Sequence, residues 1–298
     1  MKIVVVGGGH GTAINLRALA PLDHHVHAVI TVGDDGGSSG RLRRDFGVPA
    51  LGDLRRCVVA AAGGRNALAD VFEHRFDSGP LSGHPLGNLF LASAIESGKS
   101  IEEAVDLLSA ILGVRAKISP ATLKGVELVA RTGITTVRGQ TMIAETVGLQ
   151  SLTLEPNDSR SPTRAVAALE QADLVILGPG SLFTSIVAAA LPVQIRDALT
   201  RSKARVVLVP NIDGRDPESQ HLSLDEQLIT LHDHGIRVDA VLHCLNSTLH
   251  LQGTGVEILR ADVSDEPYRH HSVAKLSIFW HEFLSTFIPH EGEAWRYE

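Results

Sequence analysis

The chain has 298 residues, of which 44% are hydrophobic and 20% charged, enough apolar residues for a sizeable folded core. Its formal net charge of −7 excludes the overall basic field of a nucleic-acid-binding domain, and its two cysteines, Cys57 and Cys244, are too few for a disulfide framework and lack metal-ligand spacing. No apolar run reaches the roughly 18 residues of a membrane span, and the chain opens with a strand pattern, so we expect a cytoplasmic protein with no membrane span and no nucleic-acid partner.

A strand, a glycine turn and a helix open the chain. Residues 2–6 (KIVVV) predict a buried strand, which leads through GGGHGT at residues 7–12 into the helical pattern NLRALA. Free amides at a helix start bind phosphate, and glycines let the backbone come close to it. Thr12 replaces the third glycine of the dinucleotide-binding fingerprint. We expect Gly8, Gly9, His10, Gly11 and Thr12 to hold one end of a ligand, with a solvated loop position as the alternative for His10.

The next predicted strand, residues 28–32 (AVITV), leads into the most polar stretch of the sequence. We expect His24, His25 and His27 before it to lie in a solvated loop. Asp34 and Asp35 follow it, at the strand end where open α/β sheets bind ligands. Adjacent carboxylates repel a bare phosphate and suit a divalent cation or a sugar hydroxyl. Asp53 supplies a third carboxylate. The alternative is that these residues only form turns and helix caps. The ligand candidates that accompany them are Gly37, Ser38, Ser39 and Arg41.

Residues 54–112 are predicted to be mostly helical, with breaks at Gly63-Gly64 and in a loop at residues 77–86. In SGHPLGN (residues 82–88), Asn88 is expected to cap the next helix or to orient a ligand. His84 lies between glycine and proline, where a polar ring has little core to fill, so we include it among the ligand candidates. Residues 116–154 then predict a small antiparallel β excursion, with strand patterns around VELVAR, TTVRG and QTMIAETV.

A second α/β half begins near residue 161. Helix 162–171 and strand 173–177 (DLVIL) lead into GPGS at residues 178–181 and a helix that starts near Leu182. Strands 205–209 and 238–243 and helices 223–234 and 268–287 complete this half. Hydroxyls in the first turn of a helix suit either capping or an anion. The phosphate candidates at this second glycine turn are Gly178, Gly180, Ser181 and Thr184.

The motifs GGGHG, TVGDDGGSSGRLRR, GDLRRCVVA, SGHPLGNL, ADLVILGPGSLFTSI and a late PYRH follow one another in an order that closely resembles the YvcK/CofD superfamily. Within it, the chain resembles the gluconeogenesis factor (YvcK/YbhK-like) branch. The resemblance implies one Rossmann-like three-layer α/β/α domain over residues 1–298, with a mostly parallel sheet, a helical insertion at about residues 54–112 and a small antiparallel excursion at about residues 116–154. Residues 213–219 (DGRDPES) depart from the Gly-Glu-Thr run of many members of this branch.

In that superfamily, YvcK-like members bind UDP-sugars and influence carbon metabolism, cell envelope and cell shape, whereas CofD-like members transfer a phospholactyl group from a nucleotide-activated donor with Mg2+. We therefore predict one cleft for a nucleotide diphosphate-sugar, with Asp34, Asp35 and Asp53 as ligands of Mg2+ if metal takes part. No catalytic residue is assigned. A UDP-sugar-binding regulator ranks first, a CofD-like phosphotransferase second and an NAD(P) oxidoreductase last, and the resemblance is compatible with a homodimer.

Overall fold

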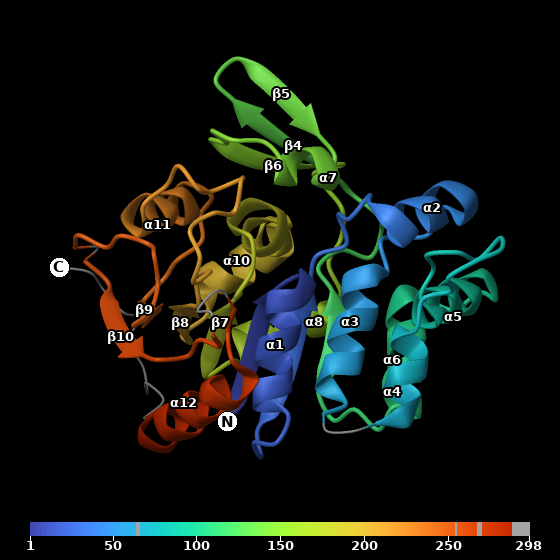
Figure 1. Cartoon of the computed structure of the whole chain (residues 1–298), viewed down its shortest axis with the longest axis horizontal. Helices are drawn as coiled ribbons and strands as arrows, with labels where there is room; N and C mark the ends of the chain where they lie inside the picture. The colour runs from blue at the N-terminus through green and yellow to red at the C-terminus, as the bar shows by residue number, and fades with distance from the viewer. Residues whose placement is uncertain (64–65, 254, 267–269, 288–298) are drawn as a thin grey trace.

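Seven short apolar segments pair in parallel to form the main sheet of the computed structural model (Figure 1). The structure describes residues 1–63, 66–253, 255–266 and 270–287. Chain order runs outward from β1 on one side of the sheet and outward from β7 on the other, which makes the β1/β7 boundary a topological switch point. In spatial order the strands are β10 (Glu257–Ala261), β9 (Ala240–Cys244), β8 (Arg205–Leu208), β7 (Leu174–Leu177), β1 (Lys2–Gly7), β2 (His25–Ile30) and β3 (Lys117–Pro120).

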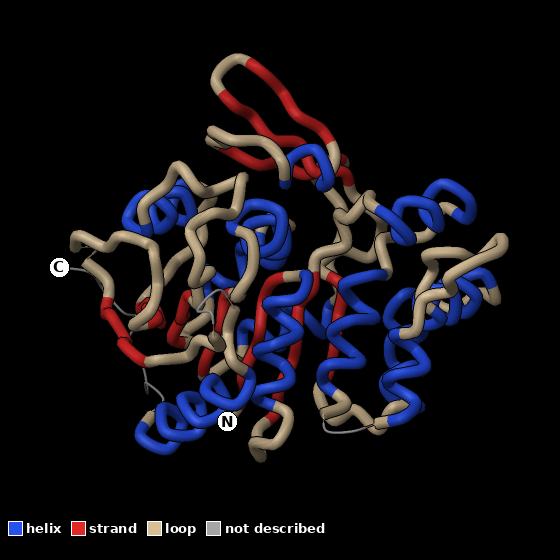
Figure 2. The backbone as a smooth tube through the Cα atoms, in the orientation of Figure 1, coloured by secondary structure: helices blue, strands red, loops and turns tan. Residues whose placement is uncertain are grey.

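Helices cover both faces of this sheet (Figure 2), which explains why its central strands β1 and β7 are nearly continuous apolar runs. Ile3 and Val5 of β1 pack on one face, and Val4 and Val6 pack on the other, because successive side chains of a strand alternate. The first face carries α1 (Gly9–Leu19), α3 (Gly52–Ala61) and α12 (Val273–Thr286). The second carries α8 (Thr163–Glu170), the π-helical turn η1 (Leu182–Val187), α9 (Ala188–Ala190), α10 (Val193–Arg201) and α11 (Leu224–Asp233).

The chain between β2 and β3 is helical. It forms α2 (Gly37–Phe46), α3, α4 (Ala67–Glu73), α5 (Leu86–Glu96) and α6 (Ile101–Ile111). Ser100 and Glu103 form a reciprocal capping box that fixes the start of α6. This segment is packed against the β2 and β3 side of the sheet through α3 and α6. It therefore widens one side of the molecule and leaves the carboxyl ends of the central strands open.

A separate antiparallel sheet projects from the top of the molecule in Figure 1, with strand order β5-β4-β6. Its strands are β4 (Glu127–Thr132), β5 (Thr135–Arg138) and β6 (Ser151–Glu155). The α/β class predicted from the sequence, with a mostly parallel sheet and a small antiparallel one, is thus confirmed. The predicted strand at QTMIAETV is wrong, because Gly139, at φ 85°, turns the chain out of β5 and into the short helix α7 (Gln140–Ala144).

Strand β2 begins at His25, earlier than the sequence predicts, and ends at Ile30. The expectation of a solvated histidine loop is therefore wrong for His25 and His27, which pair in register with β1. The predicted start of the last helix, at residue 268, lies outside the described residues, and α12 begins at Val273.

Within the described ranges, no single helix has the length and apolar character to cross a membrane. By length and composition alone, one bent pair of helices, Leu182–Ala190 and Val193–Arg201, meets that requirement.

The two glycine turns, at residues 7–12 and 178–181, touch at the switch point. A Cβ on Gly11 would lie 2.3 Å from the carbonyl oxygen of Pro179, a backbone atom that cannot swing away. We expect Gly11→Ala to lower the free energy of unfolding by about 1–3 kcal/mol, although alanine is the better helix former. Urea unfolding measures this, with Gly125→Ala as the matched control, because its Cβ would meet nothing closer than 3.6 Å. Equal stability of both variants would contradict the close contact.

Candidate functional site

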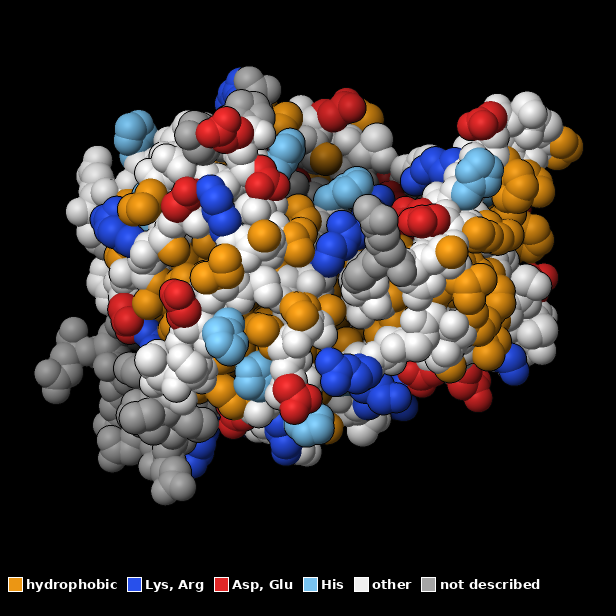
Figure 3. All heavy atoms as spheres, turned by 60° about the horizontal axis from the view of Figure 1, so that its bottom comes forward, with side chains coloured by type: hydrophobic (Ala, Val, Ile, Leu, Met, Phe, Trp, Pro, Cys, Tyr) orange, Lys and Arg blue, Asp and Glu red, His pale blue; other side chains and the backbone are white. Residues whose placement is uncertain are grey.

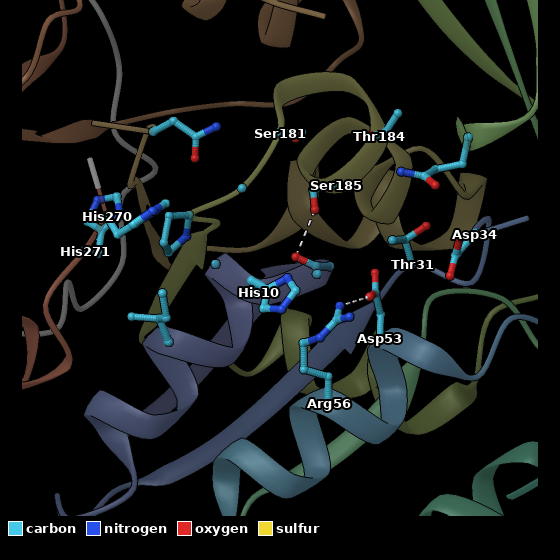
Figure 4. A pocket seen from close by; sticks show the side chains of 18 of the residues that line it. His10, Thr31, Asp34, Asp53, Arg56, Ser181, Thr184, Ser185, His270 and His271 are labelled. Carbon is cyan, nitrogen blue, oxygen red and sulfur yellow. Dashed lines mark hydrogen bonds and ion pairs between the residues drawn. The ribbon is translucent and has the colours of Figure 1, made fainter. Parts of the chain in front are cut away.

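A cavity of about 440 Å³ opens at the carboxyl ends of β1, β7 and β8 (Figure 4). This is the switch point of the sheet, where open α/β folds bind their ligands. Figure 4 shows His270 and His271 on one side of it and Asp34 on the other, with His10 and Asp53 between them. Of the residues predicted from the sequence, the cavity brings together Gly8, Gly9, His10, Gly11, Asp34, Asp53, Gly180, Ser181 and Thr184.

The first turn of α1 forms one wall of the cavity. Its N-cap is Gly8, in an extended conformation, which offers no side chain to the amides that follow. The Gly9 amide bonds to the Asp53 carboxylate. The pKa of His10 lies below its ordinary value because of burial and the nearby Arg56 guanidinium, so the ring is neutral at pH 7. Asp53 engages the Gly9 amide and the Arg56 guanidinium, and no N-cap side chain covers the rest of this helix start. The positive end of the helix dipole and the nearby Arg56 suit a phosphate.

Two of the three predicted metal carboxylates face this cavity. Asp53 lies in the first turn of α3 and pairs with Arg56 at 2.6 Å. Burial and the charge of Asp34 raise the pKa of Asp53, while Arg56 lowers it. Asp34 accepts a hydrogen bond from the Gly36 amide at 2.9 Å. Asp35 points elsewhere, because it accepts hydrogen bonds from the amide and hydroxyl of Thr141 at 2.9 and 2.8 Å.

These carboxylates do not form an all-protein metal site. Among the described residues, no group of three His, Cys, Asp or Glu side chains is arranged to hold a metal ion. Asp34 and Asp53 nevertheless match Mg2+ chemistry, since Mg2+ is commonly held by one or two carboxylates together with the phosphates of a substrate. The residues present therefore fit Mg2+ that arrives with a phosphorylated ligand, and Asp34 and Asp53 are the ones that would hold it.

At the second glycine turn, the hydroxyls expected to meet phosphate are bonded within the protein. Thr184 donates to Glu218 at 2.8 Å, Ser185 donates to the Gly8 carbonyl at 2.9 Å, and Ser181 bonds to Asp216. Glu218 also accepts hydrogen bonds from the amides of Phe183 and Thr184 at 2.8 and 3.2 Å. An internal carboxylate thus occupies the start of η1, where the sequence places a phosphate.

Gly178 lies outside the cavity and faces α1. Its carbonyl accepts a hydrogen bond from the Asn15 side chain at 3.0 Å, and Asn15 in turn accepts one from the indole of Trp280 at 2.7 Å. Thr12 is fully buried beneath the first turn. Gly178 and Thr12 thus support the cavity from behind instead of lining it.

Three of the remaining candidates, Ser38, His84 and Asn88, form a buried network between α2 and α5, which adjoins Asp34 at Gly52. Ser38 is hydrogen-bonded to His84 at 2.8 Å and to the Asn88 amide at 3.0 Å. Asn88 also accepts a hydrogen bond from Arg55 at 3.3 Å. The expected capping role of Asn88 is wrong, because Pro85 is the N-cap of α5. Gly37, Ser39 and Arg41 belong to α2, and Arg41 donates to the Ser82 carbonyl at 2.7 Å.

Known proteins resemble this chain both in sequence and in structure. A family model described as "2-phospho-L-lactate transferase CofD" matches residues 3–266. The chain belongs to this CofD family. A "Gluconeogenesis factor" from Listeria innocua is 32% identical over 293 residues, which are 96% of this chain and 89% of that protein. A crystal structure of a UPF0052 family protein from Bacillus halodurans superposes with a TM-score of 0.87 at 30% identity, covering 93% of this chain and 97% of that one.

A relative from Clostridium acetobutylicum is 38% identical over 250 residues, which are 81% of this chain and 55% of that protein. The chain therefore spans about half the length of this relative.

The sequence analysis missed several residues that line or support the site in this CofD-family chain. Arg56 could have been found, because it stands three positions after Asp53 on a predicted helix and so shares its face. Asn211 follows a predicted strand end. Glu218 gave no local signal, because only the fold brings it to η1. The other missed cavity residues are Ile14, Thr31, Gln140, Pro179, Ile212, His270 and His271.

Glu218 makes the stability of the fold depend on pH. Its burial, and then the charge of Asp216, raise its pKa from 4.5 to about 7. An acid with a higher pKa in the folded chain stabilises the fold, and it does so fully at pH values below its pKa in the unfolded chain. This stabilisation is lost as the pH rises through about 7. We expect the free energy of unfolding to fall between pH 4.5 and pH 7 by up to about 3 kcal/mol from this group.

Glu218→Gln tests this, because glutamine keeps the shape of the side chain and cannot ionise. Denaturant unfolding across pH 5–8 should show a flatter profile for this variant than for the unmodified chain. Glu96→Gln, at an exposed position of α5, is the matched control and should leave the profile unchanged. Parallel profiles for all three proteins would contradict the assignment.

Proposed function

We propose that this chain binds a UDP-sugar in the cavity at the switch point. In this proposal it is a gluconeogenesis factor, which is the name that its relatives carry, and as a nucleotide-sugar-binding regulator it acts on carbon metabolism, cell envelope and cell shape. The observation that carries the proposal is the first turn of α1, which has a glycine and no side chain at its N-cap, facing a 440 Å³ cavity together with Arg56. Amides, a helix dipole and a guanidinium directed at one space are what a diphosphate requires. The volume lies in the usual range of small-molecule sites.

In this proposal the diphosphate lies at the first glycine turn and not at the second. Glu218 already accepts hydrogen bonds from the amides at the start of η1, so these amides are engaged within the protein. Gly180 and Pro179 then shape the opposite wall. Asn211 and His271 line the cavity as well, and Nε2 of His271 has no hydrogen-bond partner within the described ranges. These polar groups suit the base, ribose or sugar of the ligand.

Mg2+ enters this proposal only together with the nucleotide. Bound to Asp34, Asp53 and the diphosphate, it would neutralise phosphate charge beside the two carboxylates. Without the phosphates, two carboxylates are a weak site, which agrees with the lack of a three-ligand cluster in the described part of the chain.

A CofD-like transferase is the second candidate. The family match over residues 3–266 and the placement of two carboxylates beside the proposed diphosphate favour it. In that case Asp34 and Asp53 would hold Mg2+ against the charge that develops on the leaving phosphate. Turnover distinguishes the two candidates: a regulator returns the nucleotide intact, whereas a transferase releases a nucleoside monophosphate when an acceptor is present.

Isothermal titration with UDP-N-acetylglucosamine, GDP and NAD, each with and without Mg2+, tests the proposal. We expect UDP-N-acetylglucosamine to bind more tightly than either other nucleotide. Tighter binding of GDP with nucleotide turnover would favour the transferase, and tightest binding of NAD would overturn both candidates.

Substitution of the carboxylates tests the metal position. We expect Asp34→Asn and Asp53→Asn to abolish the increase in UDP-sugar affinity that Mg2+ gives the unmodified chain, an effect of about tenfold or about 1.4 kcal/mol. Asp35→Asn should keep the increase, because Asp35 faces Thr141. Titrations with and without Mg2+ measure it. Loss of the increase in Asp35→Asn alone would refute this placement.

A further inference from the structure

A second cavity, of about 930 Å³, lies at the opposite end of the sheet from the candidate site. It opens where β1, β2 and β3 begin and is bounded on one side by α8. Strand β1 connects the two regions, because it starts at Lys2 in this cavity and ends at Gly7 beside the other, about 17 Å away at 3.3 Å per residue. Ala167 and Ala168 of α8 face it with short side chains, which leaves the space open.

Strand register gathers positively charged and ionisable side chains on one wall of this cavity. Lys2 pairs with His25 across β1 and β2, and His27 pairs with Lys117 across β2 and β3. Paired residues of neighbouring parallel strands point to the same face, and so do residues two apart on one strand. Because neighbouring strands are about 4.8 Å apart, these four side chains form one group beneath α8.

The basic side chains around this group differ in whether they have acidic partners. Arg164 is balanced by Glu102 and Asp106, at 2.8 and 2.6 Å. Arg115 faces Asp23 at 3.7 Å, with both side chains in solvent.

The two lysines have no such balance. Lys2 donates to the neutral Gln171 side chain at 3.0 Å. Neither Lys2 nor Lys117 forms an ion pair within the described ranges, in a chain that carries 34 acidic and 27 basic residues. The Asp173 carboxylate accepts a hydrogen bond from the backbone amide of Lys2 at 2.7 Å, but in the described part of the chain neither ammonium group is held in an ion pair.

The pKa of His27 is also affected by the basic side chains of this cavity. Burial, and then the charges of Arg164 and Lys117, lower its pKa to about 4, although Asp106 acts in the opposite direction. Its Nε2 is hydrogen-bonded to Ser119 at 2.9 Å, and Arg164 donates to the same hydroxyl at 2.8 Å. The ring is thus held in place as a neutral polar group beside two cations.

We propose that this cavity is a second ligand site, which binds a small organic phosphate through Lys2, Lys117 and the two strand histidines. Lysine binds phosphate as a point charge, and two lysines match the double charge of a phosphate monoester. Val4, on the α8 face of β1, and Ala167 and Ala168 of α8 give the cavity an apolar lining for the carbon part of the ligand. Figure 3 brings this end of the molecule forward, and its lower part shows Lys, Arg and His side chains together with several Asp and Glu side chains. The site is independent of the function proposed for the switch-point cavity.

Phenyl phosphate is a suitable probe, because it joins a doubly charged phosphate to an apolar ring. We expect its titration into the full chain to shift the imidazole NMR signals of His25 and His27, assigned with His25→Gln and His27→Gln, in a saturable manner. Lys117→Gln and Lys2→Gln should each weaken this binding at least tenfold. Both lysines are exposed, so the variants should fold, and thermal unfolding checks that they do.

Lys99→Gln is the matched control, because it removes the same charge from an exposed loop between α5 and α6 and should leave the affinity unchanged. Ala168→Leu, which narrows the cavity from α8, should weaken phenyl phosphate and spare inorganic phosphate. Absence of a shift at millimolar phenyl phosphate, or equal affinity in the Lys117→Gln, Lys2→Gln and Lys99→Gln variants, would overturn the proposal.

Discussion

The close approach of two glycine turns is the constraint on which the candidate site depends. β1 and β7 are neighbours in the sheet, so the chain leaving each strand must turn at the same edge and in the same small space. Gly11 rests against the carbonyl of Pro179, where even a methyl group would collide with backbone. Gly8 is similarly enclosed, since a Cβ there would lie 2.5 Å from Thr31 and 2.9 Å from Asp53. Glycine is required at position 11 because backbone packs on backbone, and at position 8 because side chains already fill the space of a Cβ. The result is a helix start that opens directly into a cavity.

Hydrogen bonds between distant segments hold the two turns in this arrangement. Ser185 bonds to the Gly8 carbonyl and so joins the second turn directly to the first. Glu218 fixes Thr184 and the start of η1 from the segment after β8. Burying a carboxylate is costly, and three hydrogen bonds offset that cost only in part, as its raised pKa shows. The same carboxylate occupies the amides at the start of η1, whereas at the start of α1 the N-cap is a glycine and Asp53 engages the Gly9 amide.

The two ends of the sheet therefore offer different chemistry. At the carboxyl ends, helix amides and Arg56 stand beside Asp34 and Asp53, an arrangement that suits a phosphate ligand carrying a divalent cation. At the amino ends, Lys2 and Lys117 stand without carboxylate partners in the described part of the chain, which suits an anion alone. Both arrangements arise from strand register and helix placement in one sheet, because β1 and β2 contribute to each end.

The sequence by itself determined the central strands of the main sheet and the two glycine turns, but not α7, β3 or β10. Runs such as KIVVV and DLVIL are buried strands because both faces of a parallel sheet are covered, and the glycines after them are read directly from neighbouring residues. The tertiary structure alone decided which polar groups face the ligand. Asp34 and Asp35 are adjacent in sequence, yet one lines the cavity and the other bonds to Thr141. Glu218 and the lysine pair at β1 and β3 depend on partners far along the chain. Local patterns report backbone conformation and burial, whereas the partner of a hydrogen bond or an ion pair is set by distances that exist only after the chain has folded.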